Sequence, residues 1–350
     1  MYFTKENLAA NSRLQAHWAE LWAQRNIYNN QHNAMIAANK ANMTAEMLAC
    51  NAVGGFEKEF WKEIDNQIIE LNTEEIGIEI VNDLMAVQTV LPIGKTLKMY
   101  SVAGDINDEV VMSMDGQVPH GFDHTEYGSD GDPIPMFAAG YGVNWRHAAG
   151  LNTVGIDLAL DSQRLKLKKF NKARVDFYLN GNERMVVDGH KAMGLKNHKN
   201  TQQLTLTTDL TTAGFEEIID FFTVGEFSVL ARNNFVAKYD RLWVSPEIMA
   251  NLARPHIVNG VIVGRVLDTV KMYAPVVGEI TQTFALKGNE ILGYQRRKNV
   301  VTPLIGMTTG VVPLPRFMPT DNYNFRIMSA EGLQITSDML GRSGVVYGHA

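Results

Sequence analysis

The chain has 350 residues, of which 45% are hydrophobic and 20% are charged, and its formal net charge is -6. This length exceeds one typical domain, so we expect two compact parts. The acidic balance argues against a dedicated nucleic-acid binder, because such a protein draws its affinity from a basic surface.

Cysteine usage and the pattern of apolar residues exclude further classes of protein. Cys50 is the only cysteine, so the chain has no intramolecular disulfide and no zinc site built from cysteines. No apolar run approaches the roughly 20 residues that span a bilayer, and the first residues lack the apolar core of a secretory signal. We expect a soluble protein with no membrane partner.

Residues 1–60 predict an N-terminal arm made of short helices. Leu14, Trp18, Leu21 and Trp22 recur at helical spacing, and polar runs rich in Asn separate the helical stretches. Because such a segment buries little surface alone, we expect it to pack on its own body or on neighbouring copies. A mobile terminus is the alternative.

Residues 61–104 predict one helix followed by strands. Ile64 and Ile68 lie at helical spacing, whereas Ile78 and Ile80 alternate as in a half-buried strand. We therefore expect a β-rich stretch after the helix.

Residues 105–150 predict an extended, acidic arm. Turn signals such as Asp115-Gly116 and Asp130-Gly131 interrupt short apolar strips, so the segment has too few apolar residues for a core. We expect a two-stranded arm that reaches away from its own domain. Asp130-Gly131-Asp132 is interpreted as a charged turn.

A long amphipathic helix is predicted from Thr153 to Asn180. Asn180-Gly181 predicts a left-handed stop at its C-terminal end. The helix would have about seven turns and one buried stripe. The apolar positions of that stripe are Ile156, Leu160, Leu167, Phe170, Ala173 and Phe177.

From about residue 211 the sequence predicts an α/β domain. Phe215 to Phe222 has helical spacing, and Ser245-Pro246 predicts a helix start because the Ser hydroxyl can cap it and the Pro needs no N–H there. Segments between Val261 and Met307 are mostly β-like. The tail alternates from Tyr323 and turns at Glu331-Gly332, which predicts a hairpin.

The sequence holds no catalytic motif that we could identify. A nucleophile elbow, a His-Glu-x-x-His zinc helix, a phosphate-binding loop and a dinucleotide fingerprint are all missing. His190 and His198, which lie among lysines, could touch phosphate or belong to a solvated loop. We expect no catalytic residue, no cofactor and no metal, with an unrelated α/β enzyme with a dispersed site as the alternative.

The order of these features resembles the major capsid (coat) proteins of tailed phages, which have the Hong Kong 97 (HK97) shell fold that encapsulins share. No single motif is specific, but the ordered set is. The phrases that carry the resemblance are Pro133-Ile134-Pro135-Met136-Phe137, Trp145-Arg146, Leu179-Asn180-Gly181, Gly194-Leu195-Lys196-Asn197 and Arg241-Leu242-Trp243-Val244-Ser245-Pro246.

The resemblance implies an α+β fold and a division of nearly the whole chain into named parts. These are an N-terminal arm (1–60), a first part of the peripheral domain (61–104), an extended loop (105–150), a spine helix with the second part of the peripheral domain (151–210), an axial domain (211–319) and a C-terminal peripheral hairpin (320–350).

The resemblance also implies a function without enzymatic activity. Copies would assemble as pentamers and hexamers into the icosahedral shell of a tailed phage, in the host cytoplasm, and would enclose double-stranded DNA in the virion through non-specific contacts. Scaffolding, decoration and portal proteins would be partners. An encapsulin-type compartment shell is the alternative. Some relatives cross-link a loop lysine to a neighbour, but no lysine occurs between Lys98 and Lys166.

Charge patterning predicts which surfaces of neighbouring copies meet. The arm is acidic and the long helix is basic, so we expect the arm of one copy to lie across the helix of its neighbour. A solvated helix face is the alternative. The predicted contact residues are Asp105, Asp108, Glu109, Asp115, Asp123 and Glu126 on the arm, and Arg164, Lys168, Lys169 and Lys172 on the helix.

Overall fold

A computed structural model describes residues 3–39, 58–71, 76–103, 127–145, 158–258, 261–315, 318, 321–338 and 340–350. The chain divides into two compact units, and each is described by itself. Unit 1 comprises Met1–Thr96, Ile134–Leu179 and Pro303–Gly332, and unit 2 comprises Leu97–Pro133, Asn180–Thr302 and Leu333–Ala350.

A four-stranded sheet forms the centre of unit 1. Its strand order is β1-β13-β14-β4. Strand β1 runs parallel to β13, and β14 pairs with β4 in antiparallel register from Tyr323↔Val143 to Ala330↔Met136. The strands are β1 (Thr89–Val90), β4 (Met136–Val143), β13 (Val301–Pro313) and β14 (Tyr323–Ile335).

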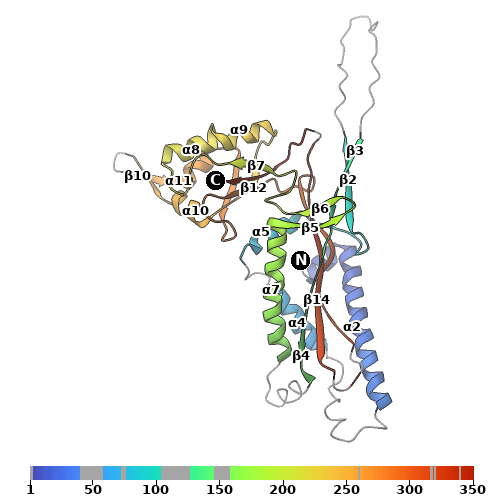
Figure 1. Ribbon diagram of the computed structural model, residues 1–350. Helices are drawn as coiled ribbons and strands as arrows, with labels where there is room; N and C mark the ends of the chain where they lie inside the picture. Colours follow the sequence, from blue (N-terminus) through green and yellow to red (C-terminus); the bar gives the residue numbers. More distant parts are fainter. Residues whose placement is uncertain are drawn as a thin grey trace, which may run out of the picture. The chain divides into compact units, whose positions relative to one another are not determined.

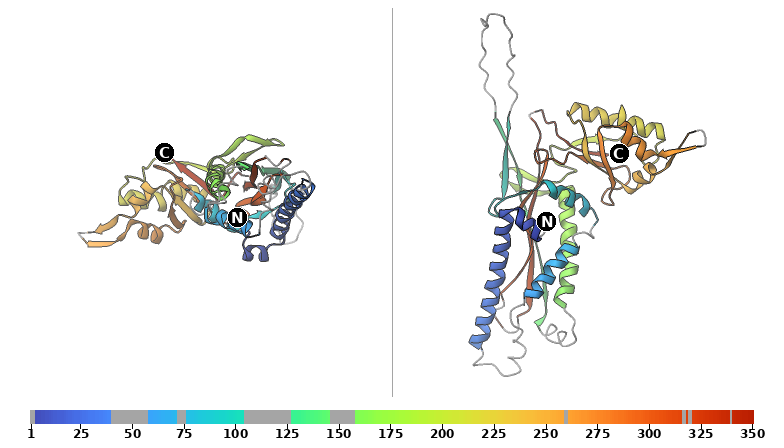
Figure 2. Two further views of the ribbon diagram at one scale, coloured as in Figure 1. Left: turned by 90° about the horizontal axis from the view of Figure 1, so that it is seen from below. Right: turned by 180° about the vertical axis from the view of Figure 1, so that it is seen from behind.

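Helices flank the long strands of unit 1, with α2 on one side and α7 and α4 on the other (Figures 1 and 2). An aromatic contact joins α4 to the sheet, because Trp61 lies edge-on to Phe325 of β14 at 6.4 Å. Within the sheet, Tyr141 of β4 stacks on Phe325 at 5.1 Å. The helices are α1 (Lys5–Ala10), α2 (Ser12–Asn39), α4 (Lys58–Leu71), α5 (Ile78–Leu84), the short 3-10 helix η1 (Met85–Val87) and α7 (Leu158–Asn180).

The N-terminal arm is predicted to consist of short helices, but α2 is a single helix of 28 residues. Leu14, Leu21 and Tyr28 are buried at seven-residue spacing, which keeps one narrow stripe of α2 on unit 1. Arg25 anchors the same stripe through two hydrogen bonds to Asp65, of 2.9 and 3.1 Å. The arm therefore packs on its own body, which was one of the two predicted outcomes.

Three other predictions for unit 1 are wrong in part. Ile78–Leu84 is helix α5 and not a strand: a left-handed Gly77 precedes it, and Val81 and Leu84 are buried beside Ile78 at helical spacing. Met136–Val143, assigned to the extended loop, is strand β4 of the sheet. The tail forms no hairpin at Glu331, because β14 continues through that residue to Ile335.

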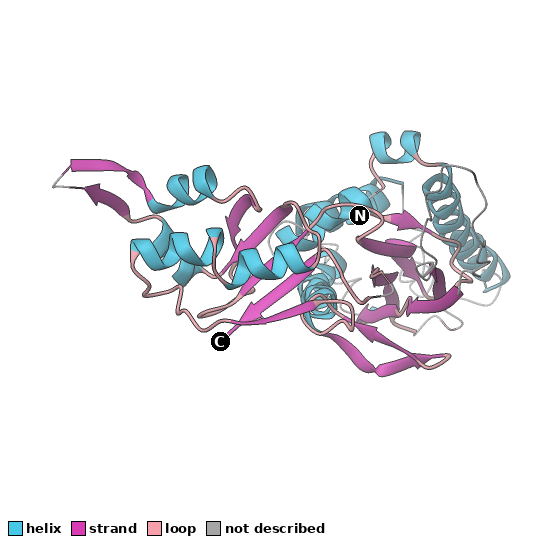
Figure 3. Cartoon of the chain, turned by 90° about the horizontal axis from the view of Figure 1, so that it is seen from above, coloured by secondary structure: helices cyan, strands magenta, loops and turns pink. Residues whose placement is uncertain are grey.

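Unit 2 is built on a five-stranded sheet of order β11-β8-β12-β15-β7, with helices packed beside it (Figure 3). The core joins both kinds of element: Phe222 and Phe227 from the helices are buried together with Tyr239 and Leu242 of β8. The elements are β7 (Gln202–Thr205), α8 (Phe215–Thr223), α9 (Glu226–Asn233), β8 (Tyr239–Val244), α10 (Pro246–Leu252), α11 (Val266–Tyr273), β11 (Val277–Gln282), β12 (Ile291–Tyr294) and β15 (Val345–His349).

In unit 2 the structure confirms the helix start that the sequence predicts at Ser245-Pro246. The Ser245 hydroxyl accepts a hydrogen bond from the Ile248 N–H at 3.2 Å, which is the predicted N-cap of α10. The β-like segments predicted from Val261 onward are correct for β10, which ends at Arg265, but the next eight residues are helix α11.

Three two-stranded ribbons complete unit 2. Strands β2 and β3 pair in antiparallel register from Leu97↔Pro133 to Ala103↔Tyr127, so the predicted arm has a two-stranded base. Strand β3 also lies beside the second ribbon, formed by β5 and β6 (Figure 1). The ribbon strands are β2 (Leu97–Ala103), β3 (Tyr127–Pro133), β5 (Gly181–Val187), β6 (His190–Met193), β9 (Pro255–Val258) and β10 (Val261–Arg265).

Candidate functional site

The candidate functional site is a row of exposed basic side chains on helix α7. Arg164, Lys168, Lys169 and Lys172 are all exposed on this helix. Positions 164, 168 and 172 lie four residues apart, which places them along one side of the helix. These four side chains, which we call the basic face, give unit 1 a row of positive charge without an acidic residue between Asp161 and Asp176.

The opposite side of α7 is buried and holds the basic face in place. Leu167, Phe170 and Phe177 are buried as predicted, but Ala173 is exposed. The helix ends at Asn180, and Gly181 adopts a φ of 66°, which is the predicted left-handed stop. Ile156 lies outside the described residues.

Arg174 lies on the same helix as the basic face, but it is buried. Its guanidinium donates to a Glu331 carboxylate oxygen of β14 at 2.9 Å, and a second guanidinium nitrogen lies 2.8 Å from the other oxygen. The Tyr178 hydroxyl donates to the same carboxylate at 3.2 Å. This arginine therefore joins α7 to the sheet and is not available to a partner.

The environment of Glu331 explains how a carboxylate is tolerated at 2% exposure. Burial by itself would raise the pKa of Glu331, but the charge and hydrogen bonds of Arg174 outweigh it and hold the pKa below its ordinary value. Burial and the neighbouring carboxylate raise the pKa of Tyr178, so its phenol stays protonated and can donate.

The acidic half of the predicted contact lies on the arm. Its six residues all fall in 104–126, outside the described residues, so the pairing with the basic face stays a prediction. These residues are Asp105, Asp108, Glu109, Asp115, Asp123 and Glu126.

Two further acids of the same arm, Asp130 and Asp132, are not in a solvated turn as predicted. Both lie on strand β3, and Asp132 is 2% exposed. The His198 ring nitrogen Nε2 lies 2.9 Å from a carboxylate oxygen of Asp132. His198 is itself buried, so the interpretation of this histidine as part of a solvated loop is wrong.

Asp130 collects its own set of donors. The Tyr100 hydroxyl donates to it at 2.8 Å, the Lys199 ammonium contacts it, and the His190 ring nitrogen Nδ1 lies 3.2 Å away. Burial would raise the pKa of Asp130, but the hydrogen bonds from Lys199 and Tyr100 lower it below its ordinary value. Neither aspartate is therefore an open contact for a neighbouring copy.

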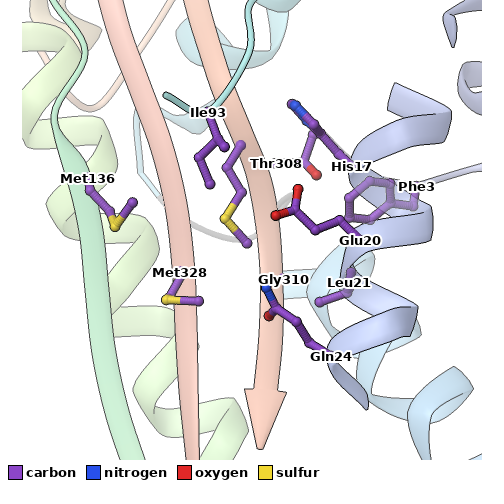
Figure 4. A pocket seen from close by; sticks show the side chains of 11 residues that line it. Phe3, His17, Glu20, Leu21, Gln24, Ile93, Met136, Thr308, Gly310 and Met328 are labelled. Carbon is purple, nitrogen blue, oxygen red and sulfur yellow. The ribbon is translucent and has the colours of Figure 1, made fainter. Parts of the chain in front are cut away.

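The described residues line a small cavity in unit 1 and an open groove in unit 2. A cavity of about 60 Å³ lies in unit 1 between α2 and the sheet, where His17 and Glu20 face Met136 and Met328 (Figure 4). It is smaller than the roughly 300 Å³ at which ligand pockets begin. An open groove of about 650 Å³ in unit 2 lies beside the stacked rings of Phe215 and His256.

One titratable group with a shifted pKa lines the smaller cavity: burial lowers the pKa of His17. Among the described residues, the carboxylates with lowered pKa values line neither the cavity nor the groove, and they are Asp130, Asp209, Glu290 and Glu331. The same part of the chain contains no group of three or more His, Cys, Asp or Glu side chains that could hold a metal ion. Nor does it contain a helix with both the length and the apolar content needed to cross a bilayer.

A protein family described as "Family of unknown function (DUF6260)" matches residues 51–348. The chain belongs to this family. A comparison with curated proteins finds no match.

Solved structures with similar folds include a virus-like particle and a phage capsid. A virus-like particle from Pyrococcus furiosus aligns with a TM-score of 0.52 and 13% identity over 83% of this chain and 100% of that chain. The capsid of Myoviridae phage XM1 aligns with a TM-score of 0.52 and 14% identity over 72% and 84%. A structure from Mycobacterium phage Adephagia aligns with a TM-score of 0.51 and 12% identity over 77% and 90%. The structure is α+β, as predicted, and its fold is similar to capsids of the HK97 type, whereas the division into spine helix, peripheral domain and axial domain stays a prediction.

Sequence reasoning did not find the buried polar pairs of this DUF6260 chain. Asp132 precedes a proline and follows a glycine, which is a turn signal, and 66 positions separate it from His198. Arg174 lies on the same helix as the exposed lysines, two residues after Lys172. No local signal distinguishes these residues, since their partners come from distant strands and loops.

Proposed function

We propose that the chain is the major capsid protein of a tailed bacteriophage, that its copies assemble into an icosahedral shell as pentamers and hexamers, and that the shell encloses double-stranded DNA. The observation that carries this proposal is the fold shared with the phage XM1 capsid over 72% of the chain. Virion location, host-cytoplasm assembly and contacts with scaffolding, decoration or portal proteins belong to the same proposal.

Microscopy tests this function directly. The purified full-length chain, with its scaffold supplied if one exists, should form closed particles of uniform diameter in negative stain. If sedimentation under coat-assembly conditions shows only monomer, the proposal is contradicted. Subunits should separate on a denaturing gel as single chains near 39.0 kDa, because the arm has no lysine to form a covalent link.

A compartment shell of the encapsulin type is the second candidate. It is supported by the P. furiosus virus-like particle, whose whole chain aligns with this one. Particle contents distinguish the two functions: nuclease-protected genomic DNA supports the phage capsid, whereas a co-purifying protein cargo without DNA supports the compartment.

Contact between the acidic arm and the basic face is the proposed mode of assembly. Exposed pairs are each worth about 0–1 kcal/mol, so the effect must come from several charges that together set register and encounter rate. Basic side chains four residues apart also repel one another by about 0.2–0.5 kcal/mol per pair. An acidic partner would remove that repulsion.

A charge swap tests the contact. Changing Lys168→Glu and Lys172→Glu together should slow assembly, and adding Asp115→Lys and Asp123→Lys should partly restore it. Lys62→Glu is the matched control, because Lys62 is exposed on α4 and lies outside the basic face. If the double reversal changes neither the assembly rate nor its salt dependence, the basic face is only solvated.

A further inference from the structure

The base of the acidic arm is connected to the rest of unit 2 by buried polar contacts. The connection begins at His198, whose two ring nitrogens are both engaged. Nδ1 accepts a hydrogen bond from the backbone N–H of Asn200 at 3.1 Å. The proton of the neutral ring therefore lies on Nε2, which donates to Asp132 at 2.9 Å.

This hydrogen bond lies where solvent cannot replace it. The side chains of His198 and Asp132 are 1% and 3% exposed. A buried polar group that loses its partner is strongly unfavourable, and more so when the group is charged. Moving β3 away from the 194–201 loop would leave the Asp132 carboxylate and the imidazole without this bond, so one placement of the strand is strongly preferred.

Asn200 and Tyr100 extend the connection to the other strand of the ribbon. The Asn200 amide donates to the Tyr100 hydroxyl of β2 at 2.9 Å and to the Ile335 carbonyl at 2.7 Å. The Tyr100 hydroxyl in turn donates across the ribbon to Asp130. Both strands of the ribbon are therefore held by the same loop.

A second row of contacts restrains the outer part of the ribbon. His190 of β6 and Lys199 of the loop both reach Asp130, and these side chains are between 21% and 45% exposed. They can exchange partners with water more readily than His198. The buried pair is therefore the firm part of the connection, and the outer row reinforces it.

We propose that His198, Asp132, Asn200 and Tyr100 form a clamp that sets the direction of the β2–β3 ribbon in the isolated subunit, so that the arm is oriented before it meets a neighbouring copy. The clamp rests on the proposed function for its purpose, but not for its existence. Orienting the arm in advance removes an ordering cost from the contact, because less conformational freedom is lost on assembly.

Two substitutions at one position separate the clamp from general folding. His198→Asn keeps an acceptor near the place of Nδ1 but has no group that reaches Asp132. His198→Gln places an amide donor near the place of Nε2 and keeps the link to the ribbon. Lys191→Ala is the matched control, because Lys191 is on the neighbouring strand β6 but makes only an exposed pair with Glu183 at 3.7 Å.

Hydrogen exchange in the unassembled full-length chain measures the clamp without any assembly. We expect His198→Asn to speed amide exchange in β2 and β3 at least tenfold, with His198→Gln and Lys191→Ala within threefold of wild type. Strand β8 (Tyr239–Val244) serves as the internal reference, since it lies in the five-stranded sheet of unit 2. Equal exchange in all variants would overturn the clamp, as would faster exchange in β8 to the same extent as in the ribbon.

Assembly kinetics then test what the clamp is for. His198→Asn should slow assembly at least threefold, and His198→Gln should restore most of the rate. A freed ribbon with an unchanged assembly rate would overturn the orienting role and leave the proposed shell function standing. A wild-type chain that never assembles, with a ribbon that still responds to His198→Asn, would contradict the shell function and not the clamp.

Discussion

Basic residues lie on both sides of helix α7, but they are buried on one side and exposed on the other. On one side Arg174 is 1% exposed and paired with Glu331, whereas Lys169 and Lys172 on the other side face solvent. The same kind of charge therefore supports the fold on one side and is exposed to solvent on the other. Burial, and not the charge itself, decides whether a basic residue contributes to the fold.

The largest effect is expected from breaking the buried pair. Arg174→Ala or Glu331→Ala should destabilise the chain by about 3–5 kcal/mol, because each leaves an uncompensated buried charge. Urea unfolding of the unassembled chain measures this. Lys172→Ala on the exposed side should stay within about 0.5 kcal/mol of wild type.

The double variant Arg174→Met with Glu331→Leu gives a sharper version of this comparison. It should be more stable than either alanine variant, because replacing a buried pair with apolar groups removes both desolvation costs. If the double variant is instead the least stable, the two residues contribute through other contacts.

Acid should weaken the buried contact between Arg174 and Glu331 before it affects the basic face. The pKa of Glu331 lies below its ordinary value of 4.5 in the folded chain, so its stabilising contribution is complete above that value. The contribution is lost as the pH falls from about 4.5 through the lower folded pKa. Unfolding free energy measured between pH 6 and pH 3 should fall more steeply in wild type than in Glu331→Gln. Parallel curves would contradict this assignment.

The end of α7 gives a smaller, backbone-based test. Gly181→Ala should cost more than the roughly 1–2 kcal/mol of a left-handed residue, because the new Cβ would also lie 2.4 Å from the Gly194 nitrogen. Gly189→Ala is the control, since its φ is 84° but no atom lies within 4 Å of the new Cβ. Thermal unfolding should rank Gly181→Ala clearly below Gly189→Ala.

The smallest expected effect is that of Lys169→Glu, which should stabilise the fold but slow assembly. Lys169→Glu places an acid three residues from Lys166 and Lys172, so it should stabilise the helix by about 0.2–0.5 kcal/mol for each pair. Assembly should nevertheless slow, because the basic face loses charge. A variant that folds less stably and assembles normally would refute both expectations.

The sequence by itself determined the features that depend on nearest neighbours along the chain. The Ser245 cap, the left-handed stop at Gly181 and the buried positions Leu167 and Phe170 follow from local spacing and local hydrogen bonding. The order of arm, long helix and α/β segments was enough to identify the HK97-type fold. These features need no knowledge of what packs against them.

Only the tertiary structure decided where the polar residues go. Glu331-Gly332 and Asp130-Gly131-Asp132 both have the composition of turns, yet both lie in strands. Arg174 pairs with Glu331, and His198 contacts one carboxylate oxygen of Asp132, although each partner comes from a distant part of the chain. A buried charge is stable only beside its partner, and that partner is brought close by folding and not by sequence spacing.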